Sequence, residues 1–286
     1  MFTLRLENPN GNSLTLTGNE NDYQVVNIEG LNPTPAVINT TDSANLDGAI
    51  FNSAKLETKN IVILVKINGD AEANRQRLYL FCRTKELCTV YYKNQNRDVF
   101  IKGYVETFEV NPFDQSQAAQ ISILCPSAYF TGAQEITTDI SNNLKRFYFP
   151  FAIDYDDPIP ISEYESERVT NVYNASESDT GVKIIININE DISSVLIKNI
   201  KTNEQMLLTY AFLEDDVVEI NTIKGQKSVA LIRNGVRSNL FTAVDRSSTF
   251  FQLAMGDNFF SYLVDGGEVE QKAYIKFVWH TIYRGV

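Results

Sequence analysis

Apolar and polar residues alternate along most of this 286-residue chain, and a period of two is typical of half-buried β-strands. The alternating segments are rich in β-branched and aromatic residues, which strands favour. Turn signals about every 8–12 residues in the second half indicate an antiparallel sandwich. The predicted strands cover residues 90–92, 99–110, 120–125, 147–153, 182–189, 195–200, 206–213, 217–223, 249–263 and 273–286.

Two Asn-Gly pairs mark β-hairpins, because both residues accept the positive φ that a tight hairpin turn requires. One pair is Asn10-Gly11, between LRLEN and SLTLTG, and the other is Asn234-Gly235, within 228–240. In the last strand, alternation places Ile275, Phe277, Trp279 and Tyr283 on one inner face.

One helix is expected in the first half, over about residues 70–84. Asp70 can cap its N-terminus, and Glu72 complements the positive end of the helix dipole. Leu78, Phe81 and Cys82 follow at the i, i+3, i+4 spacing of one face. The pattern therefore predicts an amphipathic helix that lies against a sheet.

The segment from Gly30 to Ile67 has a different character. A long turn-rich stretch leads into IVILVKI (61–67), which is apolar on both faces up to Leu64. A two-sided apolar strand must be covered on both faces, so it belongs in a packed core or a subunit interface. Long structureless loops are uncommon inside a compact domain. We therefore expect the stretch before this strand to protrude and reach a neighbouring subunit.

The fold class predicted is mainly β, with two domains. Residues 1–130 form an N-terminal β-sandwich or barrel-like domain that carries the helix and the protruding loop, and Cys125-Pro126 closes its strands. Residues 131–146 are polar and weakly patterned, which favours a linker. Residues 147–286 form a C-terminal antiparallel β-sandwich.

Composition narrows the class of protein. Hydrophobic residues make up 43% of the chain, as in globular proteins, yet no apolar run approaches the roughly 20 residues of a membrane helix. The N-terminus lacks the pattern of a secretory signal, so we expect synthesis in the cytoplasm and no membrane insertion. The three cysteines, Cys82, Cys88 and Cys125, are odd in number and lack metal-ligand spacing, which favours reduced core residues.

The net charge is −11, and residues 131–179 contribute −7 of it. A chain this acidic repels phosphates, which excludes wrapping of nucleic acid. Acidic side chains could still line a passage that DNA crosses without sticking.

Candidate chemistry is sparse, and we expect no cofactor, no metal and no catalysis. His280 is the single histidine, and a Ser/His/Asp or Cys/His site would have to use it. The loop with Asp154, Asp156 and Asp157 lacks the central Gly and distant Glu of a calcium loop, and prolines follow it. Paired carboxylates for glycosidase chemistry have no evident position, and the alternating acids of SEYESE (162–167) are typical of an exposed strand.

Three ordered groups of residues resemble the distal tail protein family of long-tailed phages and phage tail-like particles. The first is Asp47-Gly48 with Phe51 and Asn52, followed by Lys59 before the first core strand. The second closes the first domain as Ile121-Ser122, Cys125-Pro126 and Tyr129-Phe130, after Arg77-Leu78-Tyr79 and Gly103-Tyr104-Val105-Glu106. The third runs through 215–222, 225–229, 248–253 and 256–258 and resembles a galectin-like half; it departs from the family at Glu214 and Met255.

The resemblance implies a structural protein rather than an enzyme. In such a protein the N-terminal domains pack as a homohexameric ring, in the virion at the tail tip or baseplate. The ring joins the tail tube and tape-measure proteins to the tail-tip and receptor-binding proteins, and DNA is only passing cargo. It implies a galectin-like second domain, and it makes Asp47, Gly48, Phe51, Asn52 and Lys59 the candidate subunit-interface residues.

Two other functions stay open at this point. A galectin-like half suggests a carbohydrate-binding module that contributes to host-surface recognition, although fold alone does not carry function. A galectin-type set of sugar contacts cannot be assembled from one histidine and one inward-facing Trp279. The third function is hydrolysis of cell-wall polymers by carboxylates that the sequence does not locate.

Overall fold

The structure is a computed structural model that describes residues 2–18, 22–42, 47–140, 169–265 and 272–286. The chain divides into two compact units. Unit 1 comprises Met1–Gln134 together with Ile282–Val286, and unit 2 comprises Glu135–Thr281. The sequence places the end of the first domain at residue 130 and gives the last five residues to the second domain. In the structure those five residues return to unit 1, where the backbone N–H of Val286 donates to the carbonyl of Leu31 at 3.0 Å.

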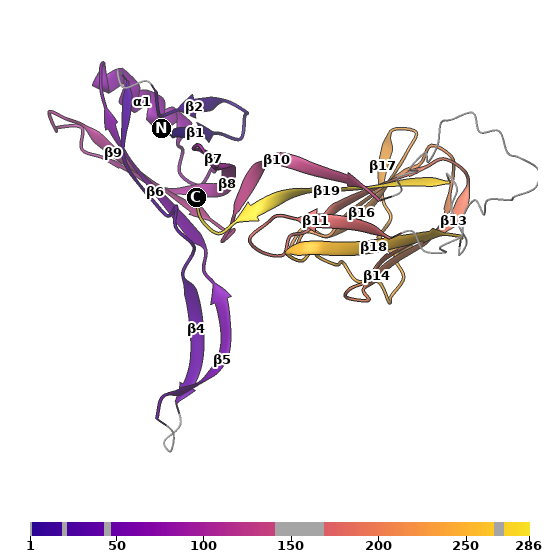
Figure 1. The fold of residues 1–286 in the computed structure, drawn as a ribbon. Coiled ribbons are helices and arrows are strands. Elements are labelled where there is room, and N and C mark those ends of the chain that lie inside the picture. Colours follow the sequence, from indigo (N-terminus) through magenta and orange to yellow (C-terminus); the bar gives the residue numbers. More distant parts are fainter. Residues whose placement is uncertain (1, 19–21, 43–46, 141–168, 266–271) are drawn as a thin grey trace, which may run out of the picture. The chain divides into compact units, whose positions relative to one another are not determined.

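Unit 1 contains one helix and nine complete strands among its described residues (Figure 1). They are β1 (Thr3–Glu7), β2 (Ser13–Thr15), β3 (Tyr23–Glu29), β4 (Ala36–Asp42), β5 (Ala49–Leu56), β6 (Lys59–Ile67), α1 (Ala71–Phe81), β7 (Leu87–Lys93), β8 (Asp98–Val110) and β9 (Ala118–Cys125). The expected Asn10-Gly11 hairpin is confirmed, since β1 pairs antiparallel with β2 and Gly11 has φ 79°.

The sheet of unit 1 has the antiparallel order β2-β1-β7-β8-β9-β6-β3. The long strand β8 connects its two halves, because the first part of β8 pairs with β7 and the second part with β9. One side chain in two along these strands points into a shared core. That core includes Leu4, Leu6, Ile61, Ile63, Ile101, Ile121 and Ile123.

Helix α1 agrees with the sequence prediction. The Asp70 carboxylate accepts a hydrogen bond from the backbone N–H of Ala73 at 3.1 Å, which caps the N-terminus. The helix ends at Phe81, and Leu78 and Cys82 are buried in the core of unit 1. Tyr79 packs edge-on against Phe108 of β8, with ring centroids 5.0 Å apart.

Strand β6 is buried on one face, whereas the sequence predicts coverage of both. Its inward side chains are Ile61, Ile63, Val65 and Ile67. Val62 and Leu64 on the other face are only half-buried within a single chain. On the same outer face, Tyr104 and Leu124 are exposed cross-strand neighbours of β8 and β9. We call Val62, Tyr104 and Leu124 the outer patch.

The stretch before β6 is a β-hairpin and not the turn-rich loop that the sequence predicts. Strands β4 and β5 pair antiparallel as a separate two-stranded sheet, and the hairpin extends away from the rest of unit 1 (Figure 1). We call residues Ala36–Leu56 the arm. The Asn, Thr and Ser residues that indicate turns occupy exposed strand positions here, where polar side chains face water without cost.

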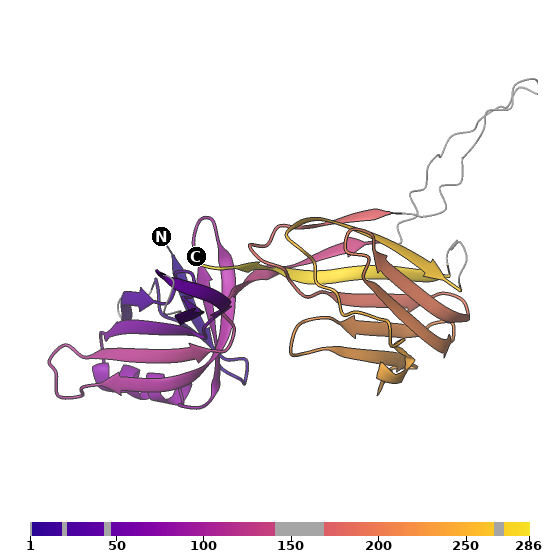
Figure 2. The ribbon, with the colours of Figure 1, turned by 90° about the horizontal axis from the view of Figure 1, so that it is seen from below.

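Unit 2 is an antiparallel sandwich of two sheets (Figure 2). Its elements are β11 (Thr170–Asn174), β12 (Lys183–Ile188), β13 (Ile192–Asn199), β14 (Gln205–Phe212), β15 (Val217–Asn221), β16 (Ser228–Arg233), β17 (Val236–Asn239), η1 (Phe241–Ala243) and β18 (Gly256–Val264). One sheet has the order β11-β18-β13-β14 and the other runs β17-β16-β15-β12, followed by β19 (Ala273–Tyr283) and β10 (Phe130–Asp139). The Asn234-Gly235 hairpin is confirmed, with φ 52° and 76° at its two central residues.

Inward side chains of both sheets fill the core of unit 2. Ile275, Phe277 and Trp279 of β19 are buried as their phase predicts, whereas Tyr283 is only half-buried and belongs to unit 1. The rings of Phe251, Phe260 and Phe277 cluster at centroid distances of 4.8–6.3 Å. Aromatic clustering of this kind adds to the stabilisation by area burial.

Two predicted segments differ from the structure. Residues 130–139 form β10, so most of the expected linker is a strand that pairs with β8 at one end and lies beside β19 at the other. Its apolar contacts are few and lie apart along the strand: Phe130 is buried in the core of unit 1 and Ile136 packs against the core of unit 2. The strand expected over 249–263 begins only at Gly256; before it, Leu253 makes an isolated bridge with Thr180. The predicted strand 147–153 lies outside the described residues.

We expect Asp216→Ala to lower the free energy of unfolding of unit 2 by about 3 kcal/mol, as for removal of a buried ion-pair partner. Asp216 is 1% exposed and accepts from Arg233 at 2.8 Å and 2.6 Å and from the backbone N–H of Leu213 at 2.9 Å. The hydrogen bond from Arg233 lowers the pKa of this carboxyl. Its stabilisation is complete above the ordinary pKa of about 3.9 and is lost as pH falls through the lower folded pKa.

Denaturant titration at pH 7 measures the loss in free energy of unfolding caused by Asp216→Ala. The same titration at pH 3 measures how much of this stabilisation is lost in acid. Asp98→Ala, which breaks the exposed pair with Lys93 at 2.7 Å, serves as the control and should change stability by less than about 1 kcal/mol. If Asp216→Ala changed the free energy of unfolding as little as the control does, the ion pair between Asp216 and Arg233 would not stabilise unit 2.

Candidate functional site

The candidate site is the arm together with its base. Asp47 and Gly48 lie at the tip, where Gly48 has φ 89° and open space around it. Phe51 and Asn52 lie on β5, whose residues are all exposed. Lys59, the first residue of β6, is buried, with 3% of its surface exposed. The structure therefore brings four of the five predicted interface residues onto the arm and places the fifth beneath it.

A β-bulge determines which side chains share a face of the arm. The register shifts between Asn39 and Thr40, so that Asn52 is the extra residue on β5. Asn52 donates to the Thr41 hydroxyl at 2.7 Å, and Asn39 donates to the Ser53 hydroxyl at 3.0 Å, which places these four on one polar face. The opposite face then carries Ile38, Phe51, Ala54 and Leu56 from alternate cross-strand pairs, with Thr40 opposite Phe51.

The described residues of the chain leave this apolar face uncovered. Ile38 and Phe51 are each 63% exposed, and Leu56 is also exposed. A lone two-stranded hairpin is marginally stable in water, and apolar side chains on it gain free energy only when another surface buries them. The arm is therefore suited to dock on a second polypeptide. Ile38 and Leu56 are exposed apolar residues of this face that the sequence motifs do not single out, although they stand at regular intervals on either side of the turn.

Lys59 acts inside its own chain. Its ammonium donates to the carbonyl oxygens of Asn32 at 2.6 Å, Gly30 at 3.3 Å and Arg284 at 3.4 Å, and it lies 4.8 Å from the centre of the Phe130 ring. Burial lowers the pKa of Lys59, since desolvation disfavours the charged form. One cation thus joins the segment that enters the arm, the start of β10 and the C-terminal residues.

Glycine is required at the base of the arm. Gly30 has φ 85°, and a Cβ there would lie 2.0 Å from the carbonyl oxygen of Asn60. Only a residue without a side chain permits this close approach. The base is therefore fixed by backbone packing at Gly30 and by the ammonium of Lys59.

Unit 2 carries a polar pocket of about 220 Å³ on the outer face of its β12-β15-β16-β17 sheet. It is lined by Lys183, Glu219, Asn221, Ser228 and Arg237. Glu219 forms ion pairs with both Lys183 and Arg237, and its hydrogen bond with Arg237 lowers the pKa of its carboxyl. The exposed rings of Tyr173, Phe241 and Phe259 are not among the lining residues. Sugar binding by this unit, and a galectin-like relationship, stay predictions.

The other candidates from the sequence lie apart from the arm. Cys82, Cys88 and Cys125 are buried in unit 1, and burial raises the pKa of Cys88 and Cys125 to about 12 and that of Cys82 as well, so these thiols are protonated at neutral pH. His280 lies on β19. The loop 154–157 and residues 162–167 lie outside the described residues. In the part of the chain that the structure describes, no His, Cys, Asp or Glu cluster could hold a metal ion, and no helix is long and apolar enough to span a membrane.

Comparison with protein families matches both units to components of phage tails. The model of the phage tail protein RIFT-related domain matches residues 10–125. The model of the siphovirus-type tail component, C-terminal domain, matches residues 175–279. The two matches follow one another along most of the chain, so the protein is a component of a phage-type tail. It belongs to the siphovirus-type distal tail protein family, as the ordered motifs indicate.

Solved structures share the whole fold. The Dit protein of phage SPP1, described as a paradigm of the hub adsorption apparatus in phages that infect Gram-positive bacteria, is 13% identical, with a TM-score of 0.70 and coverage of 98% of this chain and 99% of that one. A chain of the phage P2 baseplate in its activated conformation with Ca is 11% identical, with a TM-score of 0.55 and 98% coverage of both chains. At this identity the similarity establishes the fold. No curated protein sequence is a significant match.

Proposed function

We propose that the protein is the hub of a phage or phage-like tail: six copies close a ring at the tail tip, and the arm of each copy binds the next. The observation that carries the proposal is the uncovered apolar face of the arm, formed by Ile38, Phe51, Ala54 and Leu56. Contacts in which one surface binds a different surface of the next copy generate a closed ring when the rotation between copies closes, and an open filament when it does not. The arm supplies one such surface.

The outer patch of unit 1 is the candidate second surface. Val62 is half-buried and Tyr104 and Leu124 are exposed, so each leaves apolar area uncovered on the outer face of the sheet. Docking the arm of one copy on the outer patch of the next would bury both apolar surfaces at once. This arrangement would also supply the cover on the second face of β6 that its sequence predicts.

In the proposed place the ring joins the tail tube and tape-measure proteins on one side to the tail-tip and receptor-binding proteins on the other. The work is structural and not enzymatic, and the protein resides in the virion at the tail tip. DNA passes through the ring without binding, which the net charge of −11 favours by repelling phosphates. The hub role of the SPP1 protein supports this place in the tail.

Native mass spectrometry of the full chain over a range of concentrations tests the proposal. We expect a hexamer that accumulates as the concentration rises, because head-to-tail contacts close only when all six are made. Electron microscopy of purified tails checks the same ring where assembly of the free protein is slow. A monomer at high concentration together with tails that lack a ring of this protein would contradict the proposal.

A further inference from the structure

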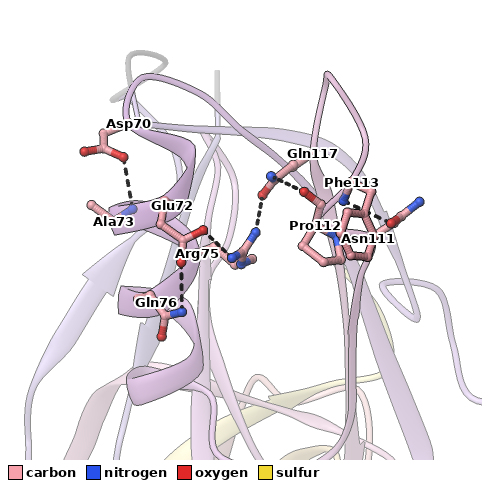
Figure 3. Close-up of polar contacts among 9 residues, drawn as sticks. All are labelled: Asp70, Glu72, Ala73, Arg75, Gln76, Asn111, Pro112, Phe113 and Gln117. Atoms are coloured by element: carbon pink, nitrogen blue, oxygen red, sulfur yellow. Dashed lines mark hydrogen bonds and ion pairs between the residues drawn. The ribbon is translucent and has the colours of Figure 1, made fainter.

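Phe113 is the most exposed large apolar side chain among the described residues, at 93%. It lies in the turn between β8 and β9, at the end of unit 1 that also carries the N-terminus of α1 (Figures 1 and 3). An exposed aromatic ring contributes nothing to the core of its own chain. An exposed ring is suited to bind a partner when the backbone that carries it is held in one conformation.

Side chains within the turn hold that backbone. The side-chain oxygen of Asn111 accepts from the backbone N–H of Phe113 at 3.1 Å, and the side-chain amide of Asn111 donates to the Asp114 carboxylate at 2.7 Å. The backbone N–H of Asp114 also donates to the carbonyl of Asn111 at 3.4 Å. Pro112 adds a fixed φ directly before the aromatic residue.

Gln117 ties the turn to helix α1 (Figure 3). Its amide donates to the carbonyl of Pro112 at 2.9 Å, and its side-chain oxygen accepts from Arg75 at 3.1 Å. Arg75 is buried and is also paired with Glu72 in the first turn of the helix. The backbone carbonyl of Gln117 accepts from Ile67 of β6 at 2.9 Å. The turn is thus supported by a helix, a strand and its own side chains.

We propose that Phe113 is a preformed binding knob for another tail protein, one that presents an apolar socket rimmed by hydrogen-bond donors or positive charge. A ring held in place before binding loses little conformational entropy on docking, and aromatic anchors in apolar sockets dominate interface energetics. This inference rests on the proposed position of the protein in a tail. It adds a contact separate from the ring contact of the arm.

Charge around the knob favours a partner surface with basic or N–H groups. The charged groups that the flanking segments place toward this turn are Asp70, Glu72, Arg75, Glu109, Asp114 and, on β6 opposite Ala118, Lys66, while Arg77, Lys102 and Glu106 stand further along α1 and β8. Arg75 is already paired with Glu72, so the surroundings are net acidic. The contact with a second copy is already assigned to the arm and the outer patch, and a membrane surface with anionic headgroups would repel the acids around the knob. A socket with basic or N–H groups at its rim is complementary.

Photocrosslinking in assembled tails tests the proposal. Phe113→p-benzoylphenylalanine is incorporated into particles in place of the wild-type protein, and the products are identified by mass spectrometry after irradiation. We expect a cross-link to one tail protein that is not this chain. A cross-link between two copies of this chain, or none in intact tails, would overturn the proposal.

Phe113→Ala gives the energetic test in the same particles. We expect incorporation of the cross-linked partner to fall at least tenfold, or about 1.4 kcal/mol, while the melting temperature and ring formation of the free protein stay unchanged. Leu80→Ala is the matched control, since Leu80 is also highly exposed in unit 1 but lies on α1, and it should change incorporation less than twofold. Equal effects of the two variants would overturn the proposal. Failure of the wild-type chain to form rings would instead contradict the proposed function.

Discussion

A variant in which a short Gly-Ser turn replaces the arm, Ala36–Leu56, should remain folded and lose the ring. None of the described arm residues belongs to the cores of unit 1 or unit 2, and β5 is exposed along its whole length. Unfolding of both units should therefore change by less than about 1 kcal/mol. Each ring contact loses its apolar anchors, which typically contribute about 2 kcal/mol or more apiece, so assembly should weaken by more than about 100-fold. Analytical ultracentrifugation and thermal unfolding measure the two quantities.

Single substitutions on the two faces of the arm show whether ring formation depends on the apolar face or only on the presence of the arm. Phe51→Ser on the apolar face should reduce the association constant by at least about tenfold. Ile50→Ser is the control: Ile50 is 51% exposed and pairs with Thr41 on the polar face. It should have little effect. An arm-less variant that still forms hexamers, or equal effects at residues 50 and 51, would contradict the role assigned to the apolar face.

The second large effect is expected at the base of the arm. Lys59→Met fills a similar volume but leaves the carbonyl oxygens of Gly30, Asn32 and Arg284 without their donor. Buried acceptors that lose a charged donor cost several kcal/mol, and this cost is reduced here because the desolvation penalty of the buried ammonium also disappears. We expect a loss of about 2–4 kcal/mol in the stability of unit 1, measured by denaturant titration.

Hydrogen exchange tells whether the loss is local. The backbone N–H of Val286 donates to the carbonyl of Leu31, which stands between two of the residues that accept from Lys59. The protection of this N–H against exchange should therefore fall most in Lys59→Met. Lys55→Met, at an exposed position of β5, is the control and should change stability by less than about 0.5 kcal/mol. Unchanged protection at Val286 would show that Lys59 does not hold the C-terminal segment.

Local patterns in the sequence predict the parts of the fold that depend on neighbours along the chain. The Asn-Gly hairpins and the Asp70-capped helix are of this kind, because the turn residues and the capping carboxylate act within a few positions. The arm could also have been found: AVINTTD and AIFNSAKL flank the turn around Asp47-Gly48 and pair over their whole lengths. Its many Asn, Thr and Ser residues obscure the alternation of apolar and polar residues that identifies a strand.

Other features depend on contacts between distant residues and could not be predicted locally. The Lys59 ammonium meets the carbonyl of Arg284, 225 positions later, and no pattern near either residue indicates it. The motif around Lys59 identifies a position that matters, but only the structure places the side chain inside the protein instead of at an interface. Likewise, the continuous apolar run shows that β6 is apolar on two faces, while the partly uncovered state of Val62 depends on how the surrounding strands pair.

The central claim is that six copies form a ring in which each arm binds the next copy. Electron cryo-microscopy of the tail tip tests it most directly. The account predicts a six-fold ring of unit 1, with Ile38 and Phe51 of each arm buried against unit 1 of the neighbouring copy. A ring in which the apolar face of the arm remains in solvent, or a tip that contains a different number of copies, would contradict it.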